Sequence, residues 1–104
     1  MGILNPEPLD ALLDERSLSR LRWRCRRGLL ENDLLIERFF NRFENTLTVY
    51  QAQGVNDLMA LTDNDLLDLL LRRKNPDQLE ASDVRQQANS PAALSVLKML
   101  RPPA

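Results

Sequence analysis

The chain has 104 residues, a formal net charge of −1 at pH 7 and a sequence pI of about 5.4, with 43% hydrophobic and 28% charged residues. This length and this balance predict one soluble globular domain with a small core, and they exclude a disordered or fibrous chain. Aromatic residues make up only 5% and leucine dominates the apolar residues, which favours helices over strands. We therefore expect an all-α fold.

The residue inventory removes most enzyme classes. The chain has no histidine, which excludes Ser-His and Cys-His nucleophile systems and removes the commonest metal ligand. Its three glycines, at positions 2, 28 and 54, cannot form a GxGxxG turn or a P-loop for a nucleotide. We therefore expect a protein that is not an enzyme, with no catalytic residues, no metal site and no cofactor site of its own.

Cysteine content and hydropathy bear on location. The single cysteine, Cys25, has no internal disulfide partner, and the N-terminus has no basic and apolar segment typical of a signal peptide. No apolar run exceeds four residues, far below the roughly 20 needed to cross a bilayer. These features predict a cytoplasmic protein with no membrane insertion.

The N-terminal segment is acidic. The first fifteen residues carry four acidic side chains, no basic one, and two prolines that disfavour an early helix. Residues 1–16 are therefore predicted to form a flexible acidic leader, a solvated chain end. The alternative is that this leader lies near the segment that follows it, because residues 16–31 contain six arginines and one glutamate.

A first helix is predicted from a serine cap to the first interior glycine. Ser17 or Ser19 can cap its start, and Arg27 is its expected last residue. Gly28 is then placed to adopt the left-handed conformation of a C-terminal cap. The arginines near that end suit the negative pole of the helix dipole.

The spacing within this helix separates a core stripe from an outer face. At about 100° per residue, the core stripe consists of Leu18, Leu21 and Cys25, and the outer face consists of Arg16, Arg20, Trp23 and Arg27. A tryptophan among arginines is either folded under a neighbouring segment or part of a contact surface, where Trp and Arg are enriched. The sequence leaves both alternatives open for Trp23.

The second helix is predicted to begin between Leu30 and Asn32 and to end near Asn45, with acidic residues in its first turn. Apolar residues recur along it at spacings of three, four or seven. They are Leu29, Ile36, Phe40, Phe43 and Leu47, and Leu34, Leu35 and Phe39 widen this stripe. This pattern identifies the central core helix, with its phenylalanines as packing residues and not as a ligand site.

Two capping patterns predict the next two short helices. Thr48-x-x-Gln51 starts one that runs to about Leu61, with Gly54 as a weak point inside it. Thr62 starts the other in the same way, and that helix ends near residue 71.

The C-terminal part is predicted to be a polar loop with one turn around residues 82–87, followed by a last helix. Ser90-Pro91 is a strong helix start and Pro102 a stop. This helix either docks on the bundle or stays detached, because the loop before it is long for so small a domain. The chain thus divides into the leader 1–16, a helical core 17–76, and a loop with the C-terminal helix, 77–104, in the same domain.

The junction of the first two helices, Arg27-Gly28-x-x-Glu31, has the chemistry of recognition. These residues at this spacing form no nucleophile, no metal site and no acid-base pair. Arginine offers a planar set of donors, glycine lets a partner backbone approach closely, and glutamate accepts hydrogen bonds. The alternative, a structural corner in which Arg27 and Glu31 pair with each other, stays open.

The stretch around this junction resembles a known family. Its residues are Trp23-Arg24-Cys25-Arg26-Arg27-Gly28-Leu29-Leu30-Glu31-Asn32-Asp33, followed by Phe39-Phe40. They resemble the SdhE family of small bacterial succinate dehydrogenase assembly factors. The similarity continues through Leu47-Thr48 and Asp63-Asn64-Asp65-Leu66 to Pro76, about half of the chain. The departures from the family are the longer acidic leader and the extended loop before the last helix.

The resemblance implies a small compact bundle of about five helices. It implies that the chain binds the flavoprotein subunit of succinate dehydrogenase or fumarate reductase and promotes covalent attachment of FAD to that subunit. The implied partner-binding residues are Arg27, Gly28 and Glu31, with Trp23, Arg26 and Asp33 as neighbours. The FAD would belong to the partner, so this chain, expected to be a monomer, would hold no cofactor stably.

Two other interaction hypotheses remain. An arginine-rich helix that includes Trp23 is also typical of a nucleic-acid-binding module. The net charge of −1 disfavours that module, and we expect no nucleic acid partner. Members of the resembled family have also been described as antitoxins, and the residues of this chain neither support nor exclude an antitoxin-like interaction domain.

Overall fold

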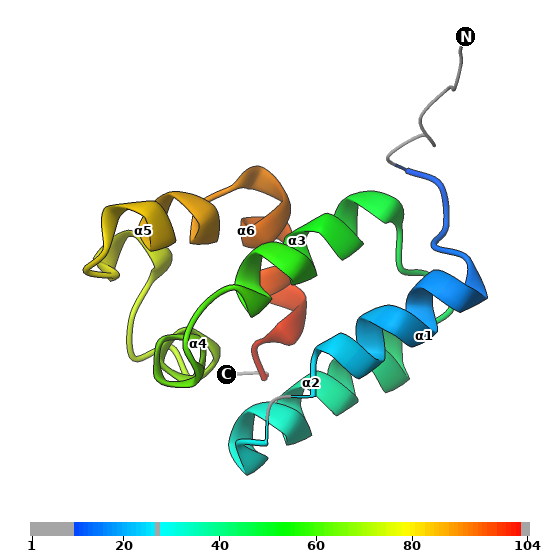
Figure 1. The fold of residues 1–104 in the computed structure, drawn as a ribbon, viewed down its shortest axis with the longest axis horizontal. Coiled ribbons are helices and arrows are strands. Elements are labelled where there is room, and N and C mark those ends of the chain that lie inside the picture. Colours follow the sequence, from blue (N-terminus) through cyan, green and yellow to red (C-terminus); the bar gives the residue numbers. More distant parts are fainter. Residues whose placement is uncertain (1–9, 27, 103–104) are drawn as a thin grey trace, which may run out of the picture.

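The computed structural model describes residues 10–26 and 28–102, and it is all-α as predicted (Figure 1). Within those residues the α-helices are α1 (Glu15–Arg24), α2 (Leu30–Phe43), α3 (Val49–Met59), α4 (Asp63–Leu70), α5 (Ser82–Ala88) and α6 (Pro91–Leu100), with one 3-10 turn, η1 (Pro76–Gln78). The described part therefore holds six helices where about five were expected. The additional helix is α5, which replaces the single turn predicted around residues 82–87.

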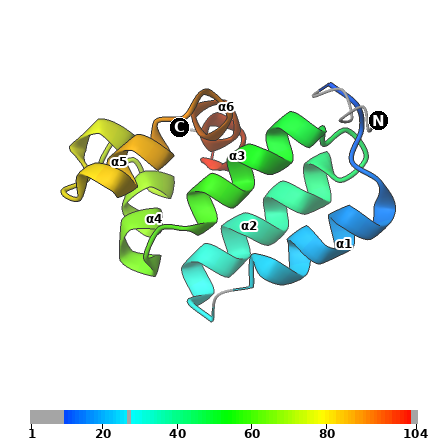
Figure 2. The same cartoon turned by 45° about the horizontal axis from the view of Figure 1, so that its top comes forward.

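The helices enclose one core. Helix α6 packs along α3, and both α4 and α6 contact α2. Helix α1 runs back alongside α2, and α5 lies at the other end of the molecule (Figures 1 and 2). The largest fully buried side chains include Phe39, Phe40, Leu47, Leu58, Leu66, Leu69, Leu70 and Leu79. The last helix is thus docked on the bundle, and the detached alternative is wrong.

Four of these helices, α1, α3, α4 and α6, begin at a side-chain cap. Thr48 forms a full capping box with Gln51, and Thr62 and Ser90 each accept a hydrogen bond from the backbone N–H three residues later. The predicted starts of α3, α4 and α6 are therefore confirmed. Such caps satisfy backbone donors that have no partner within the helix.

The first helix differs from its predicted bounds. Its cap is Asp14, whose carboxylate accepts from the Ser17 backbone N–H at 2.7 Å. Ser17 is therefore a donor in the first turn and not the cap, and α1 ends at Arg24 instead of Arg27. The bonds from Ser17 lower the pKa of Asp14 below its ordinary value. The cap is therefore fully formed above that ordinary value and is lost as pH falls through the lowered one.

The end of the predicted leader is bound to the bundle. Residues 1–9 lie outside the described residues. The Leu13 N–H donates to the Leu47 carbonyl at 2.8 Å, and the Val49 N–H donates to the Ala11 carbonyl at 2.9 Å. Since α1 begins at Glu15, the helix starts two residues before the predicted start of the helical core at residue 17. The division of the chain at residues 16 and 76 stays a prediction.

The core stripes were predicted with one error. Leu21 and Cys25 of the first stripe are buried, and Phe39 and Phe40 form packed ring pairs in the core. Leu34, however, is 59% exposed. At 100° per residue Leu34 lies on the side of α2 opposite Phe39, so it belongs to the solvent-facing side of the helix and not to the core.

No helix among residues 10–26 and 28–102 is long and apolar enough to cross a membrane.

Gly54 allows α3 and α6 to approach each other closely. A Cβ at this position would overlap the Ala92 carbonyl oxygen, and it would lie 2.6 Å from the Ala92 carbonyl carbon and 2.9 Å from Val96 Cγ2. The glycine predicted to be a weak point of the third helix is therefore a contact point between two helices. The loss of helix propensity at glycine is offset by the packing that it permits.

We predict that Gly54→Ala destabilises the fold. Because the new methyl group meets backbone atoms, α6 must move away from α3, at a cost of about 1–3 kcal/mol. Thermal unfolding followed by far-UV circular dichroism should show a midpoint lower by roughly 4–8 °C per kcal/mol. Gln53→Ala, at an exposed position of the same helix, is the control and should leave the midpoint nearly unchanged. An equal midpoint for Gly54→Ala and the parent protein would contradict the close packing.

Candidate partner-binding site

The predicted recognition motif falls on the corner between α1 and α2, residues 25–29. After α1 ends, the Cys25 N–H donates to the Leu21 carbonyl at 3.1 Å and the Arg26 N–H donates to the Trp23 carbonyl at 3.2 Å. Leu29 then precedes α2 without a side-chain cap. The predicted residue Arg27 lies outside the described residues.

Gly28 has a backbone conformation that suits glycine. Its φ is +87°, and no atom lies within 4 Å of where a Cβ would stand. The left-handed conformation is confirmed, although Gly28 lies four residues beyond the end of α1 and is not its direct cap. Backbone conformation, not lack of space, therefore favours glycine here.

Asp33 fixes this corner from the first turn of α2. Its Oδ2 accepts a hydrogen bond from the Gly28 backbone N–H at 3.2 Å. The carboxylate also lies at the positive end of the helix dipole, where a negative charge is favourable. Asp33 thus positions Gly28 relative to α2, one of the roles open to a neighbour of the motif.

Trp23 belongs to the surface of the protein. Its side chain is 72% exposed, so the alternative that it folds under a neighbouring segment is wrong. The Arg26 guanidinium carbon lies 5.3 Å from the centroid of the indole ring, which is within the range of a cation–π contact. The two side chains form an exposed aromatic and cationic surface beside Gly28.

A groove of about 470 Å³ lies between α1 and α2, here called the α1–α2 groove. The residues along it that bear on recognition are Trp23, Arg26, Asp33, Ile36, Glu37 and Phe40. Ile36 and Phe40 are buried, so they form an apolar floor. The indole and a guanidinium stand on the α1 side, and two carboxylates stand on the α2 side. Such a groove can hold a peptide segment that has both apolar and charged groups.

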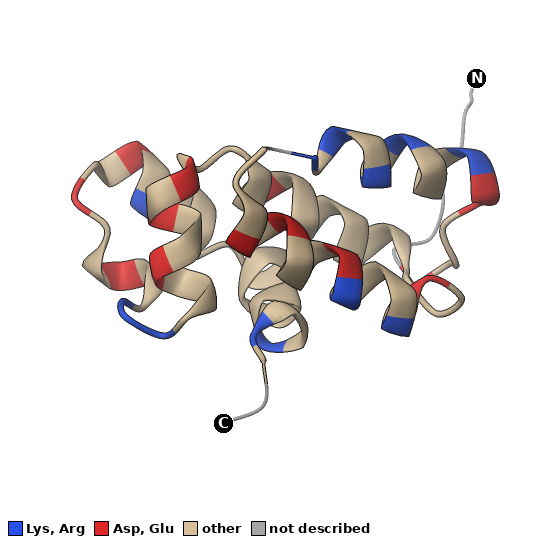
Figure 3. Cartoon of the chain, turned by 90° about the horizontal axis from the view of Figure 1, so that it is seen from below, with Lys and Arg blue, Asp and Glu red and all other residues tan. Residues whose placement is uncertain are grey.

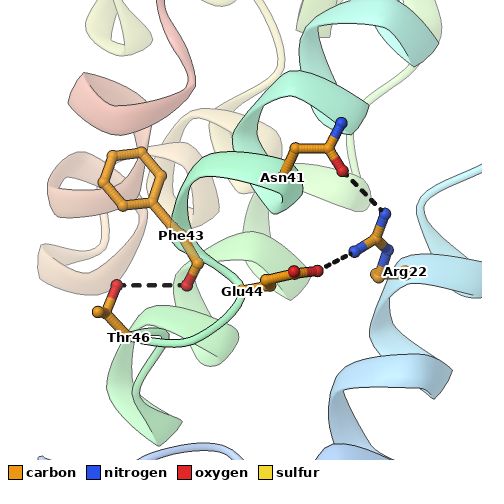
Figure 4. A network of polar contacts seen from close by, with 5 residues as sticks. All are labelled: Arg22, Asn41, Phe43, Glu44 and Thr46. Atoms are coloured by element: carbon orange, nitrogen blue, oxygen red, sulfur yellow. Dashed lines mark hydrogen bonds and ion pairs between the residues drawn. The ribbon is translucent and has the colours of Figure 1, made fainter.

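Part of the positive charge of α1 is used inside the fold. Arg22 Nη1 forms an ion pair with Glu44 at 2.7 Å, and its Nη2 donates to Asn41 at 3.4 Å (Figure 4). Arg24 Nη1 donates to Asn56 of α3 at 2.7 Å. These two arginines attach α1 to α2 and α3. In Figure 3 the ribbon of α1 is coloured by several basic residues, and that of α4 and α5, at the other end of the molecule, by acidic ones.

Glu31 lies in the first turn of α2 with its side chain exposed. Among the residues that the structure describes, it makes no hydrogen bond and no ion pair. Whether Arg27 and Glu31 pair with each other lies outside the described residues. Glu31 therefore presents a carboxylate to solvent next to the corner, as a partner-binding residue would.

Asn32 is a residue of this stretch that the sequence interpretation missed. It is fully buried, and its Nδ2 donates to the Asp63 carbonyl oxygen at 3.1 Å. The start of α2 is thereby tied to the start of α4. The signal was present, because Asn32 lies on the stripe of Ile36 and Phe40 at spacings of four, and a polar residue on a core stripe needs a hydrogen-bond partner.

The structure brings four of the six predicted site residues together. Trp23, Arg26 and Asp33 line one groove, and Gly28 is hydrogen-bonded to Asp33. Glu31 is not among the lining residues, and it faces solvent on α2. Within the described ranges, no three acidic or cysteine side chains are grouped so that they could hold a metal ion. The arrangement is suited to recognition of a protein surface.

Comparisons with known proteins identify the family of this chain. Residues 19–90 match the family model described as "Flavinator of succinate dehydrogenase". A protein of Ralstonia nicotianae named "FAD assembly factor SdhE" is 45% identical over 101 residues, which is 97% of this chain and 98% of that protein. Proteins of the same name from Legionella pneumophila (36% over 66 residues, 64% of this chain and 84% of the relative) and Coxiella burnetii (39% over 61 residues, 59% and 74%) are also similar.

No solved structure matches the chain significantly. The family assignment therefore depends on sequence. The family model covers more than half of the chain, and the similarity to the Ralstonia nicotianae protein spans nearly the full length of both chains. The resemblance inferred from the stretch around Gly28 is confirmed, and the chain belongs to the family described as the flavinator of succinate dehydrogenase, whose similar members are named FAD assembly factor SdhE.

Proposed function

We propose that this chain is an assembly factor that binds the flavoprotein subunit of succinate dehydrogenase, or of fumarate reductase, and promotes covalent attachment of FAD to it. The observation that carries this proposal is the near-full-length similarity to a protein named FAD assembly factor SdhE. The exposed surface of Trp23 and Arg26 beside Gly28 supports it. Aromatic and arginine side chains are the residues that most often dominate protein interfaces.

The proposed mechanism is positioning and not catalysis by this chain. The chain has no histidine, and in this proposal the side chain that receives the flavin belongs to the partner. FAD likewise stays with the partner, because neither Gly28 nor Gly54 belongs to a glycine-rich phosphate turn. Docking would hold the flavoprotein in the arrangement in which its flavin and the acceptor side chain lie close enough to react.

Each site residue has a role in the proposed docking. Arg27 offers a fork of donors to carboxylates or carbonyls of the partner. Gly28 lets a partner backbone approach the corner, and Asp33 keeps that corner in place through its bond to the Gly28 N–H. Trp23 and Arg26 form the contact surface on α1, and Glu31 accepts hydrogen bonds from the partner.

The remaining parts of the proposal concern the setting of the chain. We infer that it acts as a monomer in the cytoplasm, with a protein and not a nucleic acid as its partner. Two of its arginines, Arg22 and Arg24, already bind side chains of this chain. Fewer arginines are therefore free to bind a phosphate backbone than the sequence alone indicates.

The first test substitutes the motif. Gly28→Leu and Arg27→Ala should leave the helical fold intact and reduce covalent flavin on the co-expressed flavoprotein by at least about tenfold, the order expected when a hot spot is lost. The reason for Gly28→Leu is that a side chain at φ +87° is strained by about 1–2 kcal/mol and projects from the docking surface. In-gel flavin fluorescence of the denatured subunit measures the effect, and circular dichroism checks the fold.

The matched control for this test is Gln53→Ala, on the exposed face of α3. It should give full flavin labelling. Full labelling with both Gly28→Leu and Arg27→Ala would contradict the proposed role of the motif. The parent chain is compared first with the flavoprotein alone. If the parent chain does not raise flavin labelling above that of the flavoprotein alone, the proposed function itself is overturned.

A salt titration tests the rival hypothesis of nucleic-acid binding. Binding that neutralises several phosphates weakens steeply with salt, with a logarithmic slope of about −0.9 for each phosphate on duplex DNA. We expect only weak binding of duplex DNA or RNA at 150 mM salt, about the physiological ionic strength, by fluorescence anisotropy. Tight binding with a slope that corresponds to four or more phosphates would favour the rival.

A further inference from the structure

We propose that Leu30 and Leu34 on the outward face of α2 form the apolar centre of the surface that docks on the flavoprotein. This inference rests on the proposed function and deepens it, because the motif specifies neither leucine: Leu30 stands at its second variable position and Leu34 lies outside it. It assigns the main apolar contact to a helix face that the motif residues only border. It also specifies the chemistry of the partner surface, described below.

Both leucines are largely exposed, and neither belongs to the core. Their side chains are 67% and 59% exposed, and residues four apart in a helix lie one above the other on the same face. The core is formed by the opposite face of α2, through Ile36, Phe39 and Phe40. A single exposed leucine is ordinary, but two on successive turns form a continuous apolar strip.

The strip adjoins the α1–α2 groove through Glu37. A second, shallower hollow lies on α2 and is lined by Leu34, Glu37, Arg38, Asn41 and Arg42. Glu37 lines this hollow and the α1–α2 groove as well. The surface therefore runs from Trp23 on α1, across Glu37, to Leu34 and Leu30 on α2. A partner that covers the Trp23 side would also cover the leucines.

The charges around the strip define the partner chemistry. Glu31 and Glu37 border the leucines, as do Arg38 and Arg42, and within the described part of the chain neither carboxylate has a hydrogen bond or an ion pair. Burying such a carboxylate unpaired would oppose binding. The occupant that fits is an apolar surface of the flavoprotein that places a basic side chain against Glu37. A fully apolar partner would leave Glu37 unpaired, a uniformly acidic one would repel Glu37, and a uniformly basic one would repel Arg38 and Arg42.

The test compares two matched double substitutions. Leu30→Gln with Leu34→Gln removes the apolar strip and keeps good helix formers. Leu12→Gln with Leu94→Gln is the control, because these leucines are also exposed, at 63% and 39%, and lie before α1 and on α6. Binding of purified flavoprotein subunit to the immobilised full chain is measured by interferometry, and covalent flavin by in-gel fluorescence.

The expected result is binding at least about tenfold weaker for the strip variant, from the loss of two buried leucine contacts, and binding within about twofold of the parent for the control. Unfolding midpoints of both variants should match the parent, because all four side chains are exposed. Equal binding by the strip variant and the parent would overturn the inference and leave the proposed function standing. A parent chain that neither binds nor promotes labelling would overturn both.

A charge substitution tests the second half of the inference. Glu37→Lys should weaken binding by at least about tenfold, since it sets a cation against the basic side chain of the partner. Glu80→Lys makes the same change at an exposed position before α5 and should have no effect. Stronger binding by Glu37→Lys would contradict the stated partner chemistry. If the parent chain is dimeric by light scattering and the strip variant is monomeric, the strip mediates self-association instead, which would also overturn the inference.

Discussion

The fold depends on the close approach of α6 to α3 at Gly54. Because a Cβ there would meet the Ala92 backbone, only glycine lets α6 lie against α3 and close the core from the C-terminal side. Helices α4 and α6 then cover the buried face of α2. With that face covered by the C-terminal helices, the remaining face of α2 is left to α1 and to solvent. The position of the proposed docking surface thus follows from how the core is closed on the other side.

The parts of the fold that could be predicted are those that short segments determine. Thr48, Thr62 and Ser90 each provide a cap within one helical turn, and the structure has helices starting after all three. The length of α5, the burial of Asn32 and the exposure of Leu34 depend on which elements meet in space. Hydrophobic spacing indicates that a residue lies near a core stripe, but it does not indicate how wide a stripe the neighbouring helices cover.

The sequence predicted where the candidate site lies in the chain, but not how its side chains are arranged in space. The glycine conformation and the position of the motif between two helices followed from the sequence. The division of labour among the arginines did not, because Arg22 and Arg24 bind Glu44 and Asn56, which are distant in the sequence. These bonds are partly exposed and so contribute little individually to stability. Their effect is to hold α1, with Trp23, in a fixed position beside α2.

The proposed positioning role needs a rigid surface, and the start of α2 is held from two sides. Asp33 holds Gly28 through its backbone N–H, and Asn32 holds the Asp63 carbonyl of α4 through its amide. Within residues 10–26 and 28–102 the Oδ1 of Asn32 accepts no hydrogen bond although it is buried, and such a group costs about 1–3 kcal/mol. An apolar residue would avoid that cost but would leave the start of α4 unattached. The polar residue therefore exchanges stability for a defined position of the motif relative to the core.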